Sequence, residues 1–135
     1  MQSKLNPYLT FLGETREAME FYKGVFGGNL TISTFKEANA PHAPGQENQI
    51  MHSELSVENG ISIMASDDPE QKAKSNTSIS LSGDNETELK GYWDKLIDGA
   101  AIIVPLEKAQ WGDTFGMLTD KFGIRWMVNI TPVKA

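Results

Sequence analysis

The residues best suited to chemistry in this chain are a histidine and a glutamate two positions apart. His52 and Glu54 lie within residues 49–57, whose alternating polar and apolar residues are typical of a β-strand. Alternate residues of a strand share a face, so the carboxylate could hold the imidazole in a charged or oriented state. The pair could be a catalytic base or a nascent metal pair. The favoured alternative is the half-solvated polar face of an antiparallel sheet.

Two further residues could recognise a ligand. Arg125 could orient an anionic group, because a guanidinium pairs with a carboxylate or phosphonate in bidentate geometry, but an internal pairing with Glu54 explains it equally well. Trp111 lies in a loop, where a flat aromatic ring could stack on a ligand, cover the core or meet a second subunit. His42 falls in a long loop and is expected to be solvated.

These residues belong to a sequence that repeats. Gly60-Ile61-Ser62-Ile63-Met64 returns as Gly123-Ile124-Arg125-Trp126-Met127, and each copy follows a helix-like segment with an aromatic pair. We therefore predict a single α+β domain over residues 1–135, with two tandem β-α-β-β-β repeats at about 5–66 and 77–130. Neither repeat can bury its own sheet face, so the two are expected to pair into a concave mixed sheet with a seam between them.

The same order of elements is predicted in both repeats. In the first repeat the pattern indicates a strand over 5–11, a helix over 16–26, a strand over 30–35, a long loop over 36–48 and a hairpin over 49–57 and 61–66. A polar connector over 67–76 is followed by a strand over 77–82, a helix over 85–97, a strand over 101–106 and a hairpin over 114–119 and 124–130. Asn59-Gly60 is expected to supply the positive φ angles of a tight turn.

Strand alternation assigns the residues of the seam. If Met64 and Met127 face the concave side, alternate residues of their strands face it too. The polar residues expected there are Ser62, Ser66, Arg125, Asn129, Ser78, Ser80 and Ser82. The residues expected to face the helices or the core are Ile61, Ile63, Trp126, Val128, Met51, Leu55 and Val57, together with Leu89, Trp93, Leu96 and Ile97 of the second helix.

Several separated motifs occur in a shared order. They are Asn6-Pro7-Tyr8-Leu9, Phe21-Tyr22 before Gly27-Gly28, Met64-Ala65-Ser66-Asp67, Trp111-Gly112-Asp113, and Asp120-Lys121-Phe122-Gly123-Ile124 through Asn129. With them, nearly the whole chain resembles the vicinal oxygen chelate superfamily of glyoxalases, extradiol dioxygenases and bleomycin-resistance proteins. Within that superfamily it is similar to the PhnB-like branch. The resemblance is specific for the fold and weaker for the activity.

The resemblance implies four metal-ligand positions, typically His and Glu, on the first and last strand of each repeat. Counting from the motifs places them at Pro7, Met64, Ser78 and Met127. None is a normal ligand for a divalent metal, and a register error of one residue restores no His or Glu. No metal and no cofactor are therefore expected. The two methionines fit a flexible pocket lining better than a copper site.

Members of this branch are often labelled demethylubiquinone methyltransferases, but this sequence does not favour that activity. A nucleotide-type cofactor normally needs a Gly-rich turn between a strand and a helix, where backbone amides can approach the ligand closely. Gly13 and Gly83 stand singly in those turns.

The charge composition argues against nucleic acid and anionic membranes as partners. Eighteen acidic and twelve basic residues give a net charge of −6, and the scattered Lys and Arg form no footprint for nucleic acid or an anionic membrane. The chain has no cysteine, which excludes thiolate catalysis and Cys-ligated zinc, and no signal peptide or membrane span can be identified. A cytoplasmic protein is expected.

Two classes of function remain. The first is a small-molecule binding or sequestering protein without a metal, with a partly polar cavity that includes Met64, Met127, Ser78, Asn129, Arg125 and Trp111. The second is an enzyme for a small oxygenated or anionic substrate, with His52 and Glu54 as base and Arg125 as orienting group. The resemblance also implies a homodimer.

Overall fold

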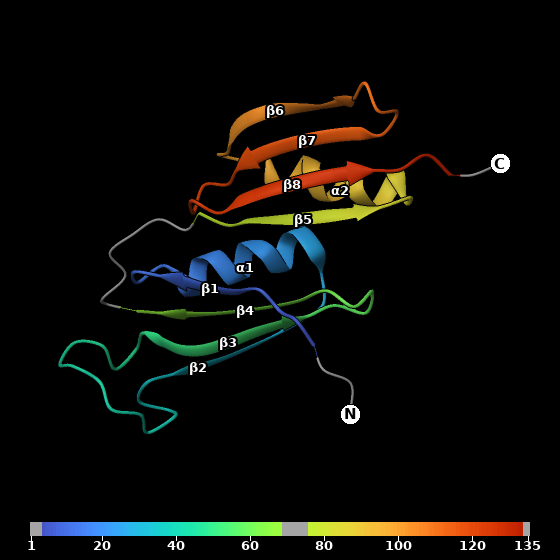
Figure 1. Cartoon of the computed structure of the whole chain (residues 1–135). Helices are drawn as coiled ribbons and strands as arrows, with labels where there is room; N and C mark the ends of the chain where they lie inside the picture. The colour runs from blue at the N-terminus through green and yellow to red at the C-terminus, as the bar shows by residue number, and fades with distance from the viewer. Residues whose placement is uncertain (1–3, 69–75, 134–135) are drawn as a thin grey trace. The chain divides into compact units, whose positions relative to one another are not determined.

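Two β-α-β-β-β units follow one another along the chain (Figure 1). The computed structural model describes residues 4–68 and 76–133, and the chain divides into one unit within residues 1–73 and another within 74–135. The α+β class and the tandem repeat are confirmed. The connector predicted over 67–76 lies mostly outside the described residues, and the concave sheet shared by both repeats stays a prediction.

The first unit is a four-stranded mixed sheet with one helix. Its elements are β1 (Tyr8–Phe11), α1 (Thr15–Phe26), β2 (Asn29–Thr34), β3 (Ile50–Ser56) and β4 (Ser62–Asp67). The strand order is β1-β4-β3-β2; β1 runs parallel to β4, and the other pairs are antiparallel. β1 is shorter than predicted and begins at Tyr8, after Pro7.

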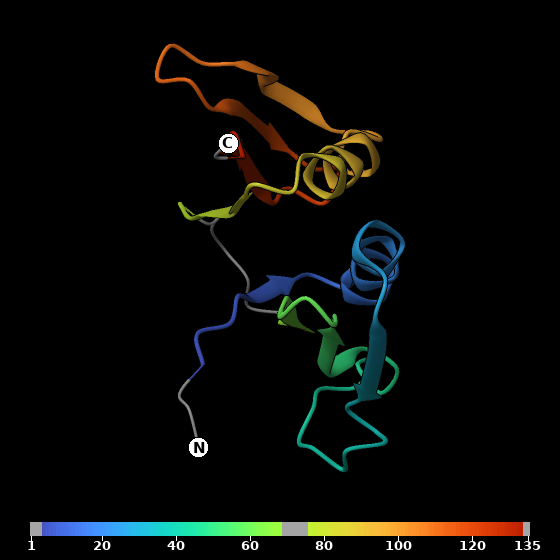
Figure 2. The same ribbon diagram turned by 90° about the vertical axis from the view of Figure 1, so that its right-hand side faces the viewer.

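The second unit repeats this arrangement. Its elements are β5 (Ser78–Gly83), α2 (Glu86–Leu96), β6 (Ala101–Lys108), β7 (Thr114–Thr119) and β8 (Arg125–Ile130). The strand order is β5-β8-β7-β6, again with one parallel pair, β5 and β8. In each unit the helix lies on one side of its own sheet (Figure 2). Neither helix is long and apolar enough to cross a membrane, as far as the described residues go.

Helix α1 covers one face of the first sheet because its apolar residues recur at helical spacing. Ala18, Met19 and Tyr22 are fully buried, and α1 contacts β2, β3 and β4. The chain leaves the helix through Gly27 and Gly28, whose φ angles are 76° and 88°. A Cβ on Gly28 would lie 2.3 Å from a backbone oxygen of β3, so glycine allows this close approach.

Strand alternation is confirmed in both hairpins. In β4 the buried residues are Ile63, Ala65 and Asp67, and in β8 they are Trp126, Val128 and Ile130. The residues between them in each strand are half-buried or exposed, so Met64 and Met127 lie on the face away from the helix. This open face of each sheet is where the sequence placed the candidate site.

Three local predictions were wrong in whole or in part. The tight hairpin turn over residues 58–60 is confirmed by the hydrogen bonds Gly60 N–H to Val57 O and Val57 N–H to Ile61 O, but only Gly60, with a φ of 90°, has the positive φ that was expected of both Asn59 and Gly60. Met51 was expected in the core, but it is the extra residue of a β-bulge and is half-buried, while Ile50 occupies the core position. Ile97 was expected on the buried face of the second helix, but it follows the last turn of α2 and is 37% exposed.

A buried aspartate anchors each unit. Asp67 accepts hydrogen bonds from Thr15 N–H (3.1 Å), the Thr15 hydroxyl (2.7 Å) and Ile50 N–H (2.9 Å), which ties the end of β4 to the starts of α1 and β3. Asp120 accepts from Phe122 N–H, Ile124 N–H and the Trp126 indole N–H, all at 2.9–3.0 Å. Asp67 ends the motif Met64-Ala65-Ser66-Asp67, and Asp120 begins the motif Asp120-Lys121-Phe122-Gly123-Ile124. Both aspartates therefore stabilise the fold.

Candidate functional site

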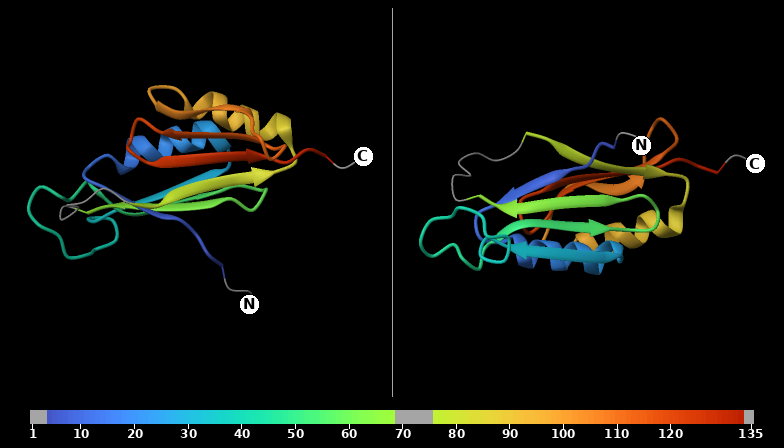
Figure 3. Two further views of the ribbon diagram at one scale, coloured as in Figure 1. Left: turned by 45° about the horizontal axis from the view of Figure 1, so that its top comes forward. Right: turned by 90° about the horizontal axis from the view of Figure 1, so that it is seen from below.

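The open face of the first sheet brings the predicted residues of repeat one into neighbouring rows. The register pairs Tyr8 with Met64, Met64 with Glu54, and Glu54 with Thr31, so these four residues cross the sheet in one row. His52 lies in the next row, paired with Ser33. The right panel of Figure 3 shows these strands with α1 beyond them. The unit's own helix leaves this face uncovered.

His52 contacts a tyrosine. Its Nδ1 lies 3.2 Å from the Tyr8 hydroxyl oxygen, and the two rings are tilted with centroids 5.9 Å apart. The predicted contact of His52 with Glu54 is not the one observed, although both residues lie on the predicted face. Sequence reasoning did not place Tyr8 among the candidate site residues. The parallel pairing of β1 with β4 is the signal that would have placed it beside this face.

Glu54 is held by its neighbouring strand. The Ser62 hydroxyl donates to Glu54 Oε2 at 3.3 Å, and both side chains are half-buried. The carboxylate lies beside Met64 in the same row, so the face offers a hydrogen-bond acceptor next to a flexible thioether. In chemical terms the first unit presents a phenol, an imidazole, a carboxylate and a methionine on one surface.

The open face of the second sheet carries the predicted residues of repeat two. Ser78 pairs with Arg125, Ser80 with Met127 and Ser82 with Asn129. Arg125 is exposed, and no ion pair involves it within residues 4–68 and 76–133. Its suggested pairing with Glu54 joins two separate units and stays a prediction.

Trp111 and Asn129 lie at the same part of the second unit. The Asn129 amide N–H donates to Asp113 Oδ2 at 2.9 Å, which connects β8 to the Trp111-Gly112-Asp113 loop. The Trp111 ring meets Phe115 edge-on at a centroid distance of 5.7 Å, and Phe115 pairs with Asn129 in the sheet register. Trp111 is 63% exposed, so it does not cover the core of its own unit.

The second unit also has a groove that sequence reasoning missed. It has a volume of about 300 Å³ and lies between α2 and β6, lined by Lys90, Trp93, Asp94, Ile102, Pro105 and Leu106. The Trp93 ring that lines this groove also packs against Gly116, where a Cβ would lie 2.8 Å from the ring. Glycine-specific contacts of this kind depend on strand register and are invisible in a linear pattern.

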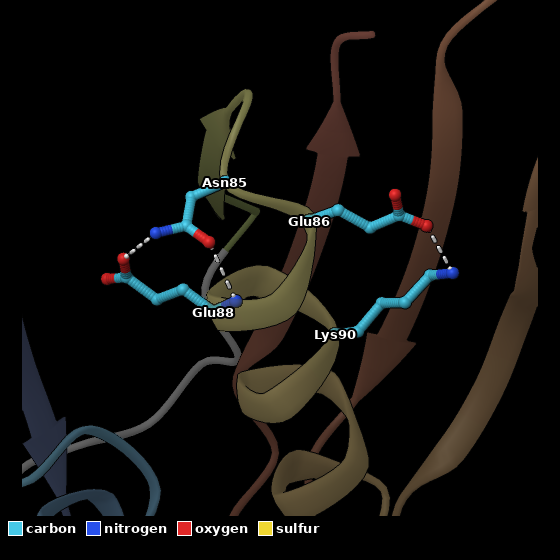
Figure 4. Close-up of polar contacts among 4 residues, drawn as sticks. All are labelled: Asn85, Glu86, Glu88 and Lys90. Carbon is cyan, nitrogen blue, oxygen red and sulfur yellow. Dashed lines mark hydrogen bonds and ion pairs between the residues drawn. The ribbon is translucent and has the colours of Figure 1, made fainter. Parts of the chain in front are cut away.

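The N-terminus of α2 is closed by the chain's own side chains (Figure 4). Asn85 Oδ1 accepts from Glu88 N–H at 3.1 Å, and its amide N–H donates to Glu88 Oε2 at 3.0 Å. Glu86 pairs with Lys90 at 2.5 Å. At the N-terminus of α1, Asp67 accepts from Thr15 N–H. At the start of each helix a side chain of the protein therefore accepts a hydrogen bond from a backbone amide that an anionic ligand could otherwise use.

The ligand positions that the resemblance implies, Pro7, Met64, Ser78 and Met127, hold no normal ligand for a divalent metal. In the sheet registers Met64 pairs with Tyr8 and Met127 pairs with Ser80, which adds a phenol and a hydroxyl beside the two thioethers. A phenol, a hydroxyl and two thioethers do not form a normal donor set for a divalent cation. Within the described ranges no group of three or more His, Asp or Glu residues could hold a metal ion. The superfamily's usual metal therefore does not fit these residues.

Comparison with solved structures identifies the fold. The chain is similar to a glyoxalase/bleomycin resistance protein/dioxygenase domain from Frankia, with a TM-score of 0.69 at 11% sequence identity. The similarity covers 100% of this chain and 96% of that domain, and it shows the glyoxalase-like fold.

A match to a family model shows the family of this chain, and two solved structures of higher sequence identity agree with it. The chain belongs to the family whose model is described as 3-demethylubiquinone-9 3-methyltransferase, which matches residues 3–129. Protein PA1353 from Pseudomonas aeruginosa is 33% identical with a TM-score of 0.83, over 98% of this chain and 100% of that one. A PhnB protein from Bacillus cereus, described as a putative 3-demethylubiquinone-9 3-methyltransferase, is 27% identical with a TM-score of 0.75, over 96% and 100%. The resemblance to the PhnB-like branch is confirmed.

Proposed function

We propose that this protein binds or sequesters a small molecule on the open faces of its sheets, without a divalent metal. The observation that carries the proposal is the open face of the first sheet, where Tyr8, His52, Glu54 and Met64 form adjacent rows that α1 leaves uncovered. Two hydrogen bonds already orient three of these side chains, which lowers the entropic cost of binding. The methionine can adapt its shape to the ligand.

The open face of the second sheet supports the same proposal. Arg125 offers a guanidinium for an anionic group, and Trp111 with Phe115 offers an aromatic surface beside the Asn129 amide. Ser78 and Met127 lie on the same face. We include in the proposal that the protein is a homodimer, which sedimentation velocity would test.

Methyl transfer is not part of the proposal. The description of the family model names that activity, but a nucleotide-type cofactor normally needs a Gly-rich turn between a strand and a helix, where the backbone can approach the ligand closely. Here Gly13 and Gly83 stand singly in those turns, and Asp67 and Asn85 accept from amides in the first turns of the two helices. Isothermal titration with S-adenosylmethionine is expected to give no heat of binding above that of dilution.

An enzyme acting on a small oxygenated or anionic substrate is the second candidate. The specific observation in its favour is the Tyr8–His52 contact on an uncovered face, because such a pair can exchange a proton with a ligand. Glu54 and Arg125 could then stabilise charge. Binding is the better supported proposal, because it requires only the surfaces described above.

The binding proposal is tested by amide-resolved NMR with a library of small carboxylates, phosphonates, phenols and ketones. We expect at least one class to shift the amides of residues 8–10, 52–56 and 62–66, and Glu54→Gln to weaken that class at least about threefold, the equivalent of losing a modest hydrogen bond. Glu20→Gln on the exposed side of α1 is the matched control and should bind as the wild type does. Amide shifts confined to surfaces other than the open faces of the two sheets would contradict the proposal. A lack of amide shifts from every compound class would contradict it as well.

A further inference from the structure

We propose that Tyr8 and His52 form a proton relay that ionises a hydroxyl group of the bound small molecule, so that the site prefers ligands with an acidic hydroxyl such as a phenol or an enol. This inference rests on the proposed function, because it requires a ligand on the open face of the first sheet. It adds the chemical class of that ligand and the role of Tyr8.

The contact spans two strand spacings. Tyr8 lies on β1 and His52 on β3, with β4 between them, so their backbones are about 10 Å apart. The Tyr8 side chain must therefore lie across β4 for its hydroxyl to reach Nδ1 at 3.2 Å. Half of Tyr8 remains exposed, and α1 packs on the opposite face. Core packing does not impose this contact, and a ligand over β4 would touch the phenol.

The two histidines of the chain differ in the partner of Nδ1, and the partner of His52 allows the hydrogen-bond direction that the relay needs. His42 Nδ1 lies 2.8 Å from the Ala40 carbonyl oxygen, which can only accept, so Nδ1 of His42 carries the proton. His52 Nδ1 faces a hydroxyl, which can donate. A neutral imidazole protonated at Nε2 accepts at Nδ1, so we assign Tyr8 as donor and His52 as acceptor.

This direction leaves the Tyr8 oxygen free to accept from a ligand hydroxyl. The ligand O–H bond breaks as its proton moves to the Tyr8 oxygen, while the Tyr8 O–H bond breaks and an N–H bond forms at His52 Nδ1. The products are a ligand oxyanion and an imidazolium, so no further reactant is needed. Successive hydrogen bonds of this kind polarise one another.

A carboxylate lies near the relay. Glu54 is two residues from His52 along β3, on the same face of the sheet. The neighbours that the other strands contribute are uncharged: Thr10 on β1, Ser33 on β2, and Met64 and Ser66 on β4. None of these described neighbours is a cation.

The test uses 4-nitrophenol, whose phenolate is coloured, together with NMR of the histidine ring nitrogens. In the free protein we expect His52 to be protonated at Nε2 and His42 at Nδ1. On titration with 4-nitrophenol we expect shifts in the amides near Tyr8 and a larger phenolate fraction for bound than for free probe at the same pH. Tyr8→Phe and His52→Gln should both lose this excess, whereas the matched control His42→Gln should keep it.

Each other outcome overturns the inference in a recognisable way. Binding without excess phenolate, or excess that survives in Tyr8→Phe, would remove the relay and leave the binding proposal intact. Protonation of free His52 at Nδ1 would reverse the hydrogen bond and remove the acceptor that the relay needs. A complete absence of amide shifts from 4-nitrophenol would refute the ligand class, while shifts from other members of the library would still support binding.

Discussion

Replacing Asp67 by asparagine should strongly destabilise the first unit, although the two side chains have nearly the same shape. Oδ1 accepts from the Thr15 N–H and hydroxyl, and Oδ2 accepts from Ile50 N–H. Whichever way an asparagine amide is turned, its NH₂ group faces a backbone N–H. At least one buried donor is then left without an acceptor.

The magnitude follows from these contacts. Hydrogen bonds to a charged group contribute about 1.5–3 kcal/mol each, and an unsatisfied buried donor costs about 1–3 kcal/mol. Since Asp67 is only 5% exposed, water cannot easily replace the lost acceptor. We expect Asp67→Asn to lower the free energy of unfolding by about 2–4 kcal/mol, a large part of the ~5–15 kcal/mol of a typical domain.

Urea denaturation followed by far-UV circular dichroism measures this loss. All three tryptophans, Trp93, Trp111 and Trp126, lie in the second unit, so their fluorescence shows separately whether that unit unfolds with the first. Asp98→Asn is the matched control, because it loses only an exposed 3.6 Å ion pair with Lys121 and should change stability by less than about 0.5 kcal/mol. Equal stability of Asp67→Asn and Asp98→Asn would refute the anchoring role of Asp67.

Three further substitutions have defined outcomes. Gly116→Ala should destabilise the chain by about 1–3 kcal/mol and shift the tryptophan emission, because the new Cβ would lie 2.8 Å from the Trp93 ring; unchanged emission would contradict that contact. Gly24→Ala should stabilise the chain by about 0.5–1 kcal/mol in thermal unfolding, because this helical position is open, and a lower melting temperature would oppose the prediction. Trp111→Phe should leave stability within about 0.5 kcal/mol and reduce ligand-induced quenching; unchanged quenching would remove Trp111 from the site.

Much of the fold could be predicted because its signals are local. The three-and-four spacing of Ala18, Met19 and Tyr22 indicates α1, and alternation around Met64 and Met127 identifies the open faces. The duplicated Gly-Ile-x-x-Met segment adds the order of elements. Each of these patterns depends on a short stretch of chain, where the periodicity of a helix or strand is visible.

The parts that could not be predicted depend on residues far apart in the sequence. Tyr8 and His52 are separated by 44 positions and meet only because β4 lies between β1 and β3. The alternation of side chains along β3 predicts the face on which His52 lies, but it does not predict the contact of His52 with Tyr8. Asp67 and Asp120 were recognised as parts of motifs, yet their buried hydrogen bonds follow from tertiary packing.

Native mass spectrometry of protein purified without a chelator tests the central claim most directly. A metal-free binding protein is predicted to show the mass of the polypeptide, alone or with a small organic compound that is released on denaturation. A divalent metal retained in stoichiometric amount would contradict the account, because the expected ligand positions Pro7, Met64, Ser78 and Met127 offer no normal ligand for such an ion.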